Sequence, residues 1–339
     1  MNRARALFNY SMTRLALAPL MLWLISTLVF LLLRIAPGDP VDAILGNRAD
    51  EAAREAMRMK LGLNQPLLNQ YLKFINDLVH GDLGFSLNTQ EAVSEIISKA
   101  LPASIELAFA ALIFATVIGF SIGFAGILKP NGKTDFAGRL YGIGTYALPP
   151  FWAAMLIQLF FAVILGWFPV GGRFPLIQPP PEITGFLVID SLISFNFPAL
   201  IGTLRHLFLP SFTLGFLLSG IFSRSLRVNM EKSLLTGHIE AARTRGINKN
   251  QIIFSHALPN ALLPVLTITG LTVASLIGGA LLIEITFSWP GIALRLQEAI
   301  SQRDYPIVQG IIVVISMLVV TVGVVVDLLI ALLDPRVSY

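Results

Sequence analysis

Residues 307–326 read IVQGIIVVISMLVVTVGVVV and contain no charged side chain. A helix of about 20 residues is long enough to cross the hydrocarbon core of a bilayer, which is roughly 30 Å thick. The whole chain agrees with a membrane location, because 55% of its 339 residues are hydrophobic and only 13% are charged, whereas soluble domains contain about 25% charged residues. The sequence therefore predicts an all-α protein that crosses a membrane.

Five more apolar runs have a suitable length: residues 15–33, 107–128, part of 140–172, 207–223 and 257–283. The first run follows a basic N-terminus, as a signal peptide does. It is longer than the apolar part of a signal peptide, however, and no A-x-A cleavage pattern follows it. We therefore interpret it as a retained helix and predict a polytopic protein with six transmembrane helices.

The basic residues indicate how the spans are oriented, because Lys and Arg are enriched in cytoplasmic loops. Residues 1–14 contain three basic and no acidic residues, and segments 129–139 and 224–256 are also basic. Residues 35–100, in contrast, contain nine acidic and six basic residues. We expect a bacterial inner-membrane protein with both termini in the cytoplasm and with residues 35–100 outside.

The predicted spans divide the chain into three parts. Residues 1–34 form an N-terminal cytoplasmic segment with the first span, and residues 35–100 form an extracytoplasmic helical region. Residues 101–339 form a core of five helices with a cytoplasmic loop at about 224–257.

Three segments outside the spans also have a recognisable pattern. Residues 50–61 and 66–79 favour helices. These helices either pack over the pathway or offer a surface to an external partner. Residues 191–204 are uncharged but too short to span, so we expect an interfacial or re-entrant segment there.

Two short motifs resemble enzyme signatures. Gly119-Phe-Ser121-Ile-Gly123 matches the G-x-S-x-G pattern of serine hydrolases, but it lies within an apolar run and not at a strand-to-helix turn. Close helix packing explains such small residues better. Residues 126–134 (GILKPNGKT) resemble a phosphate-binding loop, but five residues separate the two glycines where the motif needs four. We therefore predict that the chain is not an enzyme.

Other candidate chemistry is sparse. The chain has no cysteine and only four histidines, which are scattered, so we predict no metal site and no bound cofactor. Glu106, Glu284 and Asp327 adjoin or enter apolar runs. Ionisable groups in a membrane are often functional, but these three lie near the ends of the runs, where water and headgroups can solvate them. The sequence leaves a pathway role and a structural role open.

The loop before the fifth span, residues 240–260, reads EAARTRGINKNQIIFSHALPN. Its alanines favour a helix with little bulk, and its glycine can end that helix in a left-handed conformation. Residues 247–254 can form a second short helix, and the proline suits the start of the next span. The segment is either an ordinary polar loop or a compact helix–turn–helix that fits a groove in another protein.

This segment resembles the EAA loop of ABC-importer permeases, whose pattern E-A-A-x-x-x-G is followed by I-x-L-P. The matching residues are Glu240, Ala241, Ala242, Gly246, Leu258 and Pro259. His256 stands where the pattern has isoleucine. Further motifs resemble the dipeptide/oligopeptide/nickel permeases in the same order along nearly the whole chain. These are APGDP at 36–40, LGLNQP at 61–66, GDLGFS at 81–86, FSWPG at 287–291, RDYP at 303–306 and LDPR at 333–336.

The resemblance implies a type I ABC-importer permease fold and the B-type subunit of a peptide importer. It implies a second permease as heterodimer partner, two cytoplasmic ATP-binding subunits that use ATP, and an extracytoplasmic substrate-binding protein. The other expected partner is membrane lipid. No nucleic-acid partner is expected. In that family the loop docks into the ATPase subunit and transmits its movement, which assigns ATPase coupling to the six matching residues.

Two alternative function classes have less support in the sequence. A self-contained secondary transporter or channel would need an internal repeat and a charged midplane site, and the sequence shows neither clearly. A membrane hydrolase would rest on Ser121 alone. No residue selects a substrate among dipeptides, longer peptides, nickel chelates, glutathione and sugars.

Overall fold

The computed structural model describes residues 3–35, 41, 45, 50–60, 62–175, 180 and 182–333, so the APGDP motif and most of the LDPR motif lie outside the described residues. The described residues are helical and contain no β-strand, only an isolated bridge between Phe85 and Ala92. The helices of the first half are α1 (Arg3–Ile35), α3 (Glu51–Lys60), α4 (Leu67–Val79), α5 (Val93–Leu128), α6 (Lys133–Ala147), α7 (Pro150–Ile157) with its π-helical continuation η1 (Gln158–Ile164), and α8 (Leu187–Ile193). Those of the second half are α9 (Phe197–Leu234), α10 (Gly237–Thr244), α11 (Lys249–Gln251), the π-helix η2 (Ile252–Ala257), α12 (Leu258–Gly279), α13 (Leu281–Thr286), α14 (Ile292–Ser301) and α15 (Tyr305–Leu333).

Five described helical segments are long and apolar enough to cross a membrane: Ala16–Ile35, Val93–Leu128, Phe197–Leu234, Lys249–Val273 and Tyr305–Leu329. A sixth crossing results if α6 and the α7–η1 pair count as one broken span. These two parts are bent by 103°. The break falls at Pro149 and Pro150, because proline cannot donate the hydrogen bonds that would continue α6. The predicted all-α membrane architecture is confirmed.

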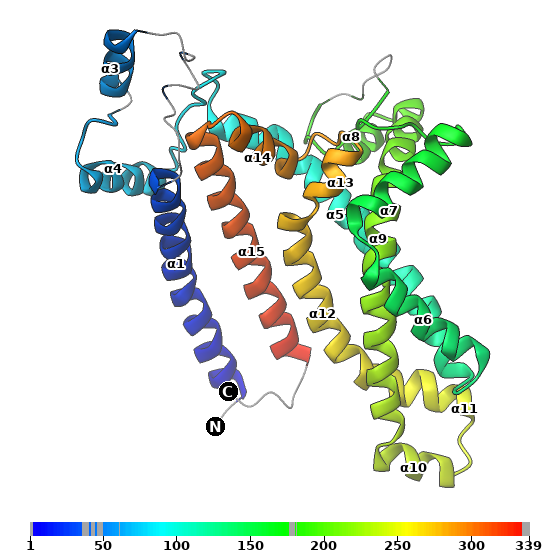
Figure 1. Cartoon of the computed structure of the whole chain (residues 1–339). Coiled ribbons are helices and arrows are strands. Elements are labelled where there is room, and N and C mark those ends of the chain that lie inside the picture. The colour runs from blue at the N-terminus through cyan, green and yellow to red at the C-terminus, as the bar shows by residue number, and fades with distance from the viewer. Residues whose placement is uncertain are drawn as a thin grey trace.

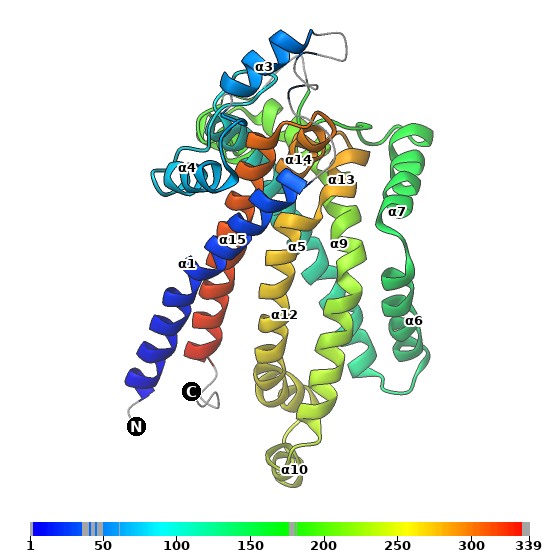
Figure 2. The same ribbon diagram turned by 60° about the vertical axis from the view of Figure 1, so that its left-hand side comes forward.

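The two ends of the molecule differ (Figures 1 and 2). The beginning of α1, the end of α15, α10 and α11 lie at one end, called the α10 end below. The short helices α8, α13 and α14, with α3 and α4, lie at the opposite end, called the α14 end. The segments that the sequence marks as basic therefore share one end of the molecule.

The centre of the molecule is the long contact between α5 and α9. Gly119 of α5 lies so close to α9 that a Cβ atom there would stand 2.6 Å from the Cβ of Phe222. Gly123 lies against Leu226 in the same way. Ser121 instead donates its hydroxyl proton to the Val117 carbonyl of its own helix and is exposed. The hydrolase-like pattern is thus a small-residue packing site, as predicted.

The segment 191–204 is not a separate interfacial element, which differs from the prediction. Residues 191–193 end α8, and residues 197–204 form the first turns of α9. Pro198 lies in the first turn of α9, where its missing N–H costs nothing, and the Asn196 side chain caps the helix by accepting from the Ala199 amide. The proline starts the helix, so the fourth span is much longer than its apolar run.

A buried ion pair joins α5 to the segment before α8. The Glu106 carboxylate lies 2.8 Å from Nη2 of Arg173, and both side chains are buried. The second carboxylate oxygen of Glu106 accepts from the Val188 amide. Arg173 also donates to the Gly185 carbonyl. The contacts of Glu106 favour the structural role that the sequence left open.

Two more buried carboxylates tie together elements of the α14 end. Glu284 of α13 accepts from the Ser104 hydroxyl of α5 at 2.6 Å and from the Leu294 amide of α14. Asp304 accepts from the Ser86 hydroxyl at 2.6 Å. This last bond joins the GDLGFS and RDYP motifs, which are distant in sequence.

Asp190 of α8 organises the loop that accepts Arg173. It is buried, and it accepts hydrogen bonds from the Thr184 hydroxyl and from the amides of Ile183, Thr184 and Gly185. Burial opposes ionisation, but these donors hold the pKa of Asp190 below its ordinary value. The ionised carboxylate therefore fixes the turn that contains the Gly185 carbonyl.

Candidate functional site

The predicted coupling residues form a projection at the α10 end (Figures 1 and 2). We call residues 235–257 the α10 knob: it comprises α10, the turn after it, α11 and η2. The knob follows α9 directly and leads directly into α12. A force on it therefore reaches two long helices through continuous backbone.

Gly246 ends α10 as the sequence predicts. Its φ is +75°, in the left-handed region that glycine adopts without strain. The Gly246 amide donates to the Arg243 carbonyl, and the Ile247 amide donates to the Ala242 carbonyl. This pair of bonds is the Schellman pattern, which turns the chain sharply after a helix.

The two alanines of the motif lie on different faces of α10. Ala242 is buried with Ile239, three residues before it on the same face of α10. Ala241 and Glu240 are exposed. No residue in the described part of the chain forms a hydrogen bond or ion pair with the Glu240 carboxylate. One face of α10 therefore holds the knob to the protein, and the other presents a carboxylate beside a small side chain.

The inner face of α10 belongs to a single apolar cluster that extends from the α10 knob into the long helices. Its buried members come from α5, α9, α10, η2 and α12: Ala115, Ile127, Phe222, Leu226, Met230, Ile239, Ala242, Ile252, Ile253, Ala257, Ala261 and Val265. Leu258 is partly buried against this cluster. Close packing of this kind transmits displacement because it leaves little free volume.

Two hydrogen bonds close the base of the knob. The Ser233 hydroxyl donates to the Ala257 carbonyl at 3.0 Å, which ties the end of α9 to the end of η2. Nζ of Lys249 donates to the Leu128 carbonyl at the end of α5. Neither residue was singled out from the sequence, because a serine and a lysine in a polar loop carry no distinguishing pattern.

The second half of the knob differs from the predicted short helix at 247–254. Asn248 caps α11 by accepting from the Asn250 amide, so the helix begins two residues later than expected. It then continues through η2 into α12 without a break. The π-turn ends next to Pro259, where proline cannot supply the ordinary backbone donor. Pro259 is exposed in the first turn of α12.

Leu235 is a surface residue of the knob that the sequence analysis missed. It is 86% exposed and lies between α9 and α10, two residues before α10 begins. It directly follows the last residue of α9, so in the sequence it cannot be distinguished from a further residue of that helix. Leu235 therefore adds one exposed apolar side chain to the surface of the knob.

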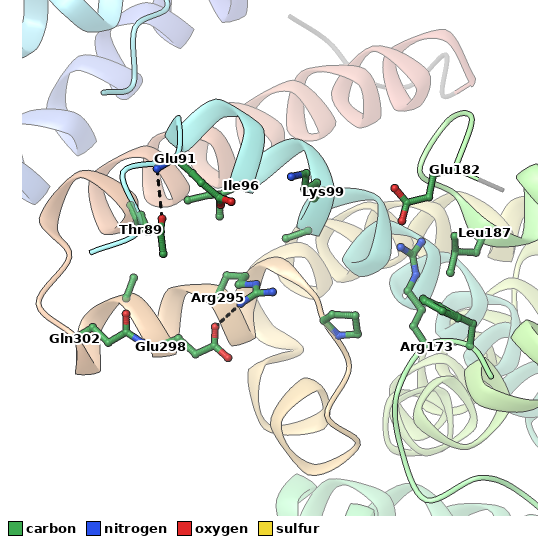
Figure 3. Close-up of a pocket in the computed structure, with 15 residues that line it drawn as sticks. Thr89, Glu91, Ile96, Lys99, Arg173, Glu182, Leu187, Arg295, Glu298 and Gln302 are labelled. Atoms are coloured by element: carbon green, nitrogen blue, oxygen red, sulfur yellow. Dashed lines mark hydrogen bonds and ion pairs between the residues drawn. The ribbon is translucent and has the colours of Figure 1, made fainter. Parts of the chain in front are cut away.

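A separate pocket of about 320 Å³ lies at the α14 end, among α5, α14 and the segment around Arg173 (Figure 3). Its charged lining residues are Glu91, Lys99, Arg173, Glu182, Arg295 and Glu298. The charges balance, and all three basic residues already have partners: Arg173 pairs with Glu106, Arg295 with Glu298 at 2.9 Å and Lys99 with Glu95 at 2.8 Å. None of the predicted coupling residues lines this pocket.

Two family models together match most of the chain. The model described as binding-protein-dependent transport system inner membrane component matches residues 115–339. The model for the N-terminal part of such membrane components matches residues 7–108.

Named relatives extend over nearly the whole length. A di/tripeptide transport system permease protein of Pseudomonas aeruginosa is 39% identical over 316 residues, which cover 93% of this chain and 94% of the relative. A dipeptide transport system permease protein of Alkalihalophilus pseudofirmus is 38% identical over 330 residues, or 97% and 99% of the two chains. An oligopeptide transport system permease protein of Bacillus subtilis is 34% identical over 316 residues, or 93% and 94%.

Proposed function

The chain belongs to the binding-protein-dependent transport system inner membrane components, and from this premise we propose that it is the B-type permease subunit of an ATP-driven importer for peptides. The proposed substrate class follows from the three relatives, whose names specify di/tripeptide, dipeptide and oligopeptide transport. The chain would form the translocation pathway together with a second, different permease subunit.

The exposed face of the α10 knob supports the proposed coupling role. Glu240 and Ala241 are available to a partner, while Ile239 and Ala242 of the same helix are fixed in the core cluster. We assign the docking of a cytoplasmic ATP-binding subunit to the exposed face. Arg243 and Arg245 are exposed beside it, so a complementary groove would have acidic residues at its rim.

The proposed mechanism is a change of access driven from the knob. ATP binding and hydrolysis occur in two partner subunits, and the chain itself catalyses no reaction. Movement of those subunits displaces α10, and the packed cluster passes the displacement to α5, α9 and α12. Two permease subunits can then alternate between an outward and an inward state, because ATP binds to one state better than to the other.

The membrane orientation follows from the same assignment. The α10 end would be cytoplasmic, with both termini, and the α14 end would face outward, where a substrate-binding protein delivers peptide. The basic loops at the α10 end support this arrangement.

A pull-down tests the proposal. A tag on this chain, in gently solubilised membranes, should recover a second permease and an ATP-binding subunit. The Glu240→Ala/Gly246→Pro double variant should keep the second permease and lose the ATP-binding subunit. Glu51→Ala is a matched control, because Glu51 is also exposed but lies in α3 at the other end.

Two results would contradict the proposal. One is recovery of the chain alone together with solute uptake driven by an ion gradient in vesicles without an ATPase. The other is full recovery of the ATP-binding subunit by the double variant, which would remove the coupling role from the α10 knob.

A further inference from the structure

Helix α4 is attached to the last turns of α1 by one of its faces. The Tyr71 hydroxyl lies 2.7 Å from the Thr27 hydroxyl, and the Gln70 side chain accepts from Nε of Arg34 at 2.9 Å. Phe30 of α1 contacts the ring of Tyr71, with ring centres 5.4 Å apart. Figures 1 and 2 show α4 running across α1, not along it.

A second face of α4 is apolar and uncovered. Leu68 is 65% exposed, Leu72 is 56% exposed and Val79 is 77% exposed. Their spacing of four and seven residues places them on one side of the helix. Lys73, which is exposed, and Asp77, which is partly exposed, lie about 100–180° around the helix from these three residues and form its polar side. The helix thus has an attached face, an uncovered apolar face and a polar face.

The contacts with α1 show which way the apolar face points. Arg34 ends the apolar run of α1, and Thr27 lies seven residues earlier, about 10 Å nearer the middle of the membrane at 1.5 Å per residue. Gln70 contacts Arg34, and Tyr71, about 100° further around α4, contacts Thr27. A further step of about 100° in the same direction reaches Leu72. Gln70 thus points toward the edge of the membrane, and Tyr71 points toward its interior. Leu72, one step further in the same direction, is therefore on the side of α4 that faces the interior.

The uncovered face also continues a lipid-facing surface. The span Ala16–Ile35 of α1 is only 17% buried within the protein. Its exposed residues in the last turns include Leu24, Leu28, Leu31 and Leu32. The apolar face of α4 begins where this surface ends.

We propose that α4 is an interfacial helix, which lies in the headgroup layer of the bilayer with Leu68, Leu72 and Val79 in contact with phospholipid acyl chains. Its polar side, with Lys73 and Asp77, faces headgroups and water. An amphipathic helix that lies in the membrane plane buries its apolar side by a few ångströms in this way. The occupant of the uncovered face is lipid, because the face continues the lipid-facing surface of α1 and points toward the membrane interior.

The absence of cysteine from the chain makes a direct test practical. Single cysteines at Leu68, Leu72, Lys73 and Asp77 would be labelled with an environment-sensitive dye in the complete assembly, reconstituted into phosphatidylethanolamine/phosphatidylglycerol nanodiscs. The assembly with the unsubstituted chain gives the background from partner cysteines. Quenching is then measured with nitroxide groups near the headgroup end of the lipid acyl chain and with aqueous iodide.

The proposal predicts opposite quenching on the two sides of α4. Dyes at Leu68→Cys and Leu72→Cys should be quenched several-fold more by lipid nitroxide than dyes at Lys73→Cys and Asp77→Cys, which iodide should quench more. Equal iodide quenching at all four positions would overturn the proposal. Shielding of Leu68→Cys and Leu72→Cys that occurs only after a substrate-binding protein is added would also overturn it, in favour of a protein contact.

A second measurement avoids substitutions in α4. The unsubstituted assembly would be irradiated in bilayers that contain a phospholipid with a photoreactive acyl chain, and the adducts mapped by mass spectrometry. Adducts on Leu68, Leu72 or Val79 support the interfacial position. Their absence, with adducts present on α1, would overturn it.

Discussion

Ala241 and Ala242 have the same side chain, but Ala241 is exposed and Ala242 is buried. Substitutions at the two positions can therefore distinguish an effect on docking from an effect on folding. Ala242 is packed in the core cluster, so Ala242→Leu should overpack it and lower the free energy of unfolding by about 1–3 kcal/mol. Ala241 is exposed, so Ala241→Leu should change stability by less than about 0.5 kcal/mol and should instead prevent the ATP-binding subunit from co-purifying. Thermal unfolding of the solubilised assembly and the pull-down measure the two effects.

Ala241→Ser is the control for this pair, because it keeps the side chain small. It should retain both stability and the ATP-binding subunit. If Ala241→Leu still recovered that subunit, the exposed face of α10 would not be its docking surface.

Substitutions of Gly246 should have graded effects, because this position requires a left-handed backbone conformation and has room for a side chain. No atom lies within 4 Å of the position of an added Cβ, but φ is +75°. Gly246→Ala should therefore destabilise the end of α10 by about 1–2 kcal/mol. Gly246→Asn should cost less, since asparagine tolerates this region. Gly246→Pro should be worst, because proline fixes φ near −65° and removes the amide that donates to Arg243.

Hydrogen exchange of the α10 amides in the purified assembly would measure this order. Protection should fall from glycine through asparagine and alanine to proline. Unchanged protection in Gly246→Pro would mean that the Schellman turn does not hold α10 in place.

At the scale of elements, hydropathy located the spans but not the helices that contain them. The apolar run 107–128 is the second half of α5, and the run 207–223 is the middle of α9. Hydropathy reports contact with lipid, whereas helix length depends on caps and backbone donors. For this reason α9 begins at the Asn196 cap, well before the apolar run 207–223. The π-helix η2 likewise extends α12 backward, ahead of the run that starts at residue 257.

Short elements at the α14 end depend on partners that are distant in sequence. Helix α14 begins where its Leu294 amide meets Glu284, and α8 follows a turn that Asp190 fixes. No local sequence pattern predicts such contacts. In the α10 knob, by comparison, the Gly246 turn was predictable because a C-terminal glycine has a local cause, while the burial of Ala242 required knowledge of where the helix packs.

The ion pair between Glu106 and Arg173 predicts strong coupling between α5 and the segment before α8. Glu106→Gln or Arg173→Gln alone leaves an uncompensated buried charge and should lower the free energy of unfolding by about 3–5 kcal/mol. The double variant should be less unstable than the sum of the two single variants, because it removes both charges. A double-mutant cycle from thermal unfolding of the assembly would measure this difference, and strictly additive effects would contradict the coupling.

At the scale of the whole molecule, apolar surface is far more extensive than one soluble chain would expose. Four of the five long spans are one-third buried or less within the protein, and only Phe197–Leu234 exceeds half. The remaining surface must face lipid or a second membrane subunit. The sequence predicted this requirement through its low charge content, but it could not divide the surface between lipid and protein, because both are equally apolar.

The orientation of the molecule gives the last prediction, and the proposed function depends on it. Leu235→Cys reports on the α10 end and Glu51→Cys on the α14 end, and both positions are exposed in a chain without other cysteines. A membrane-impermeant maleimide added to intact spheroplasts should label Glu51→Cys at once and Leu235→Cys only after the membrane is disrupted. The unsubstituted chain should remain unlabelled under both conditions. The opposite pattern would place the α10 knob outside the cell, where no ATP-binding subunit could reach it, and would refute the coupling mechanism while leaving the fold unchanged.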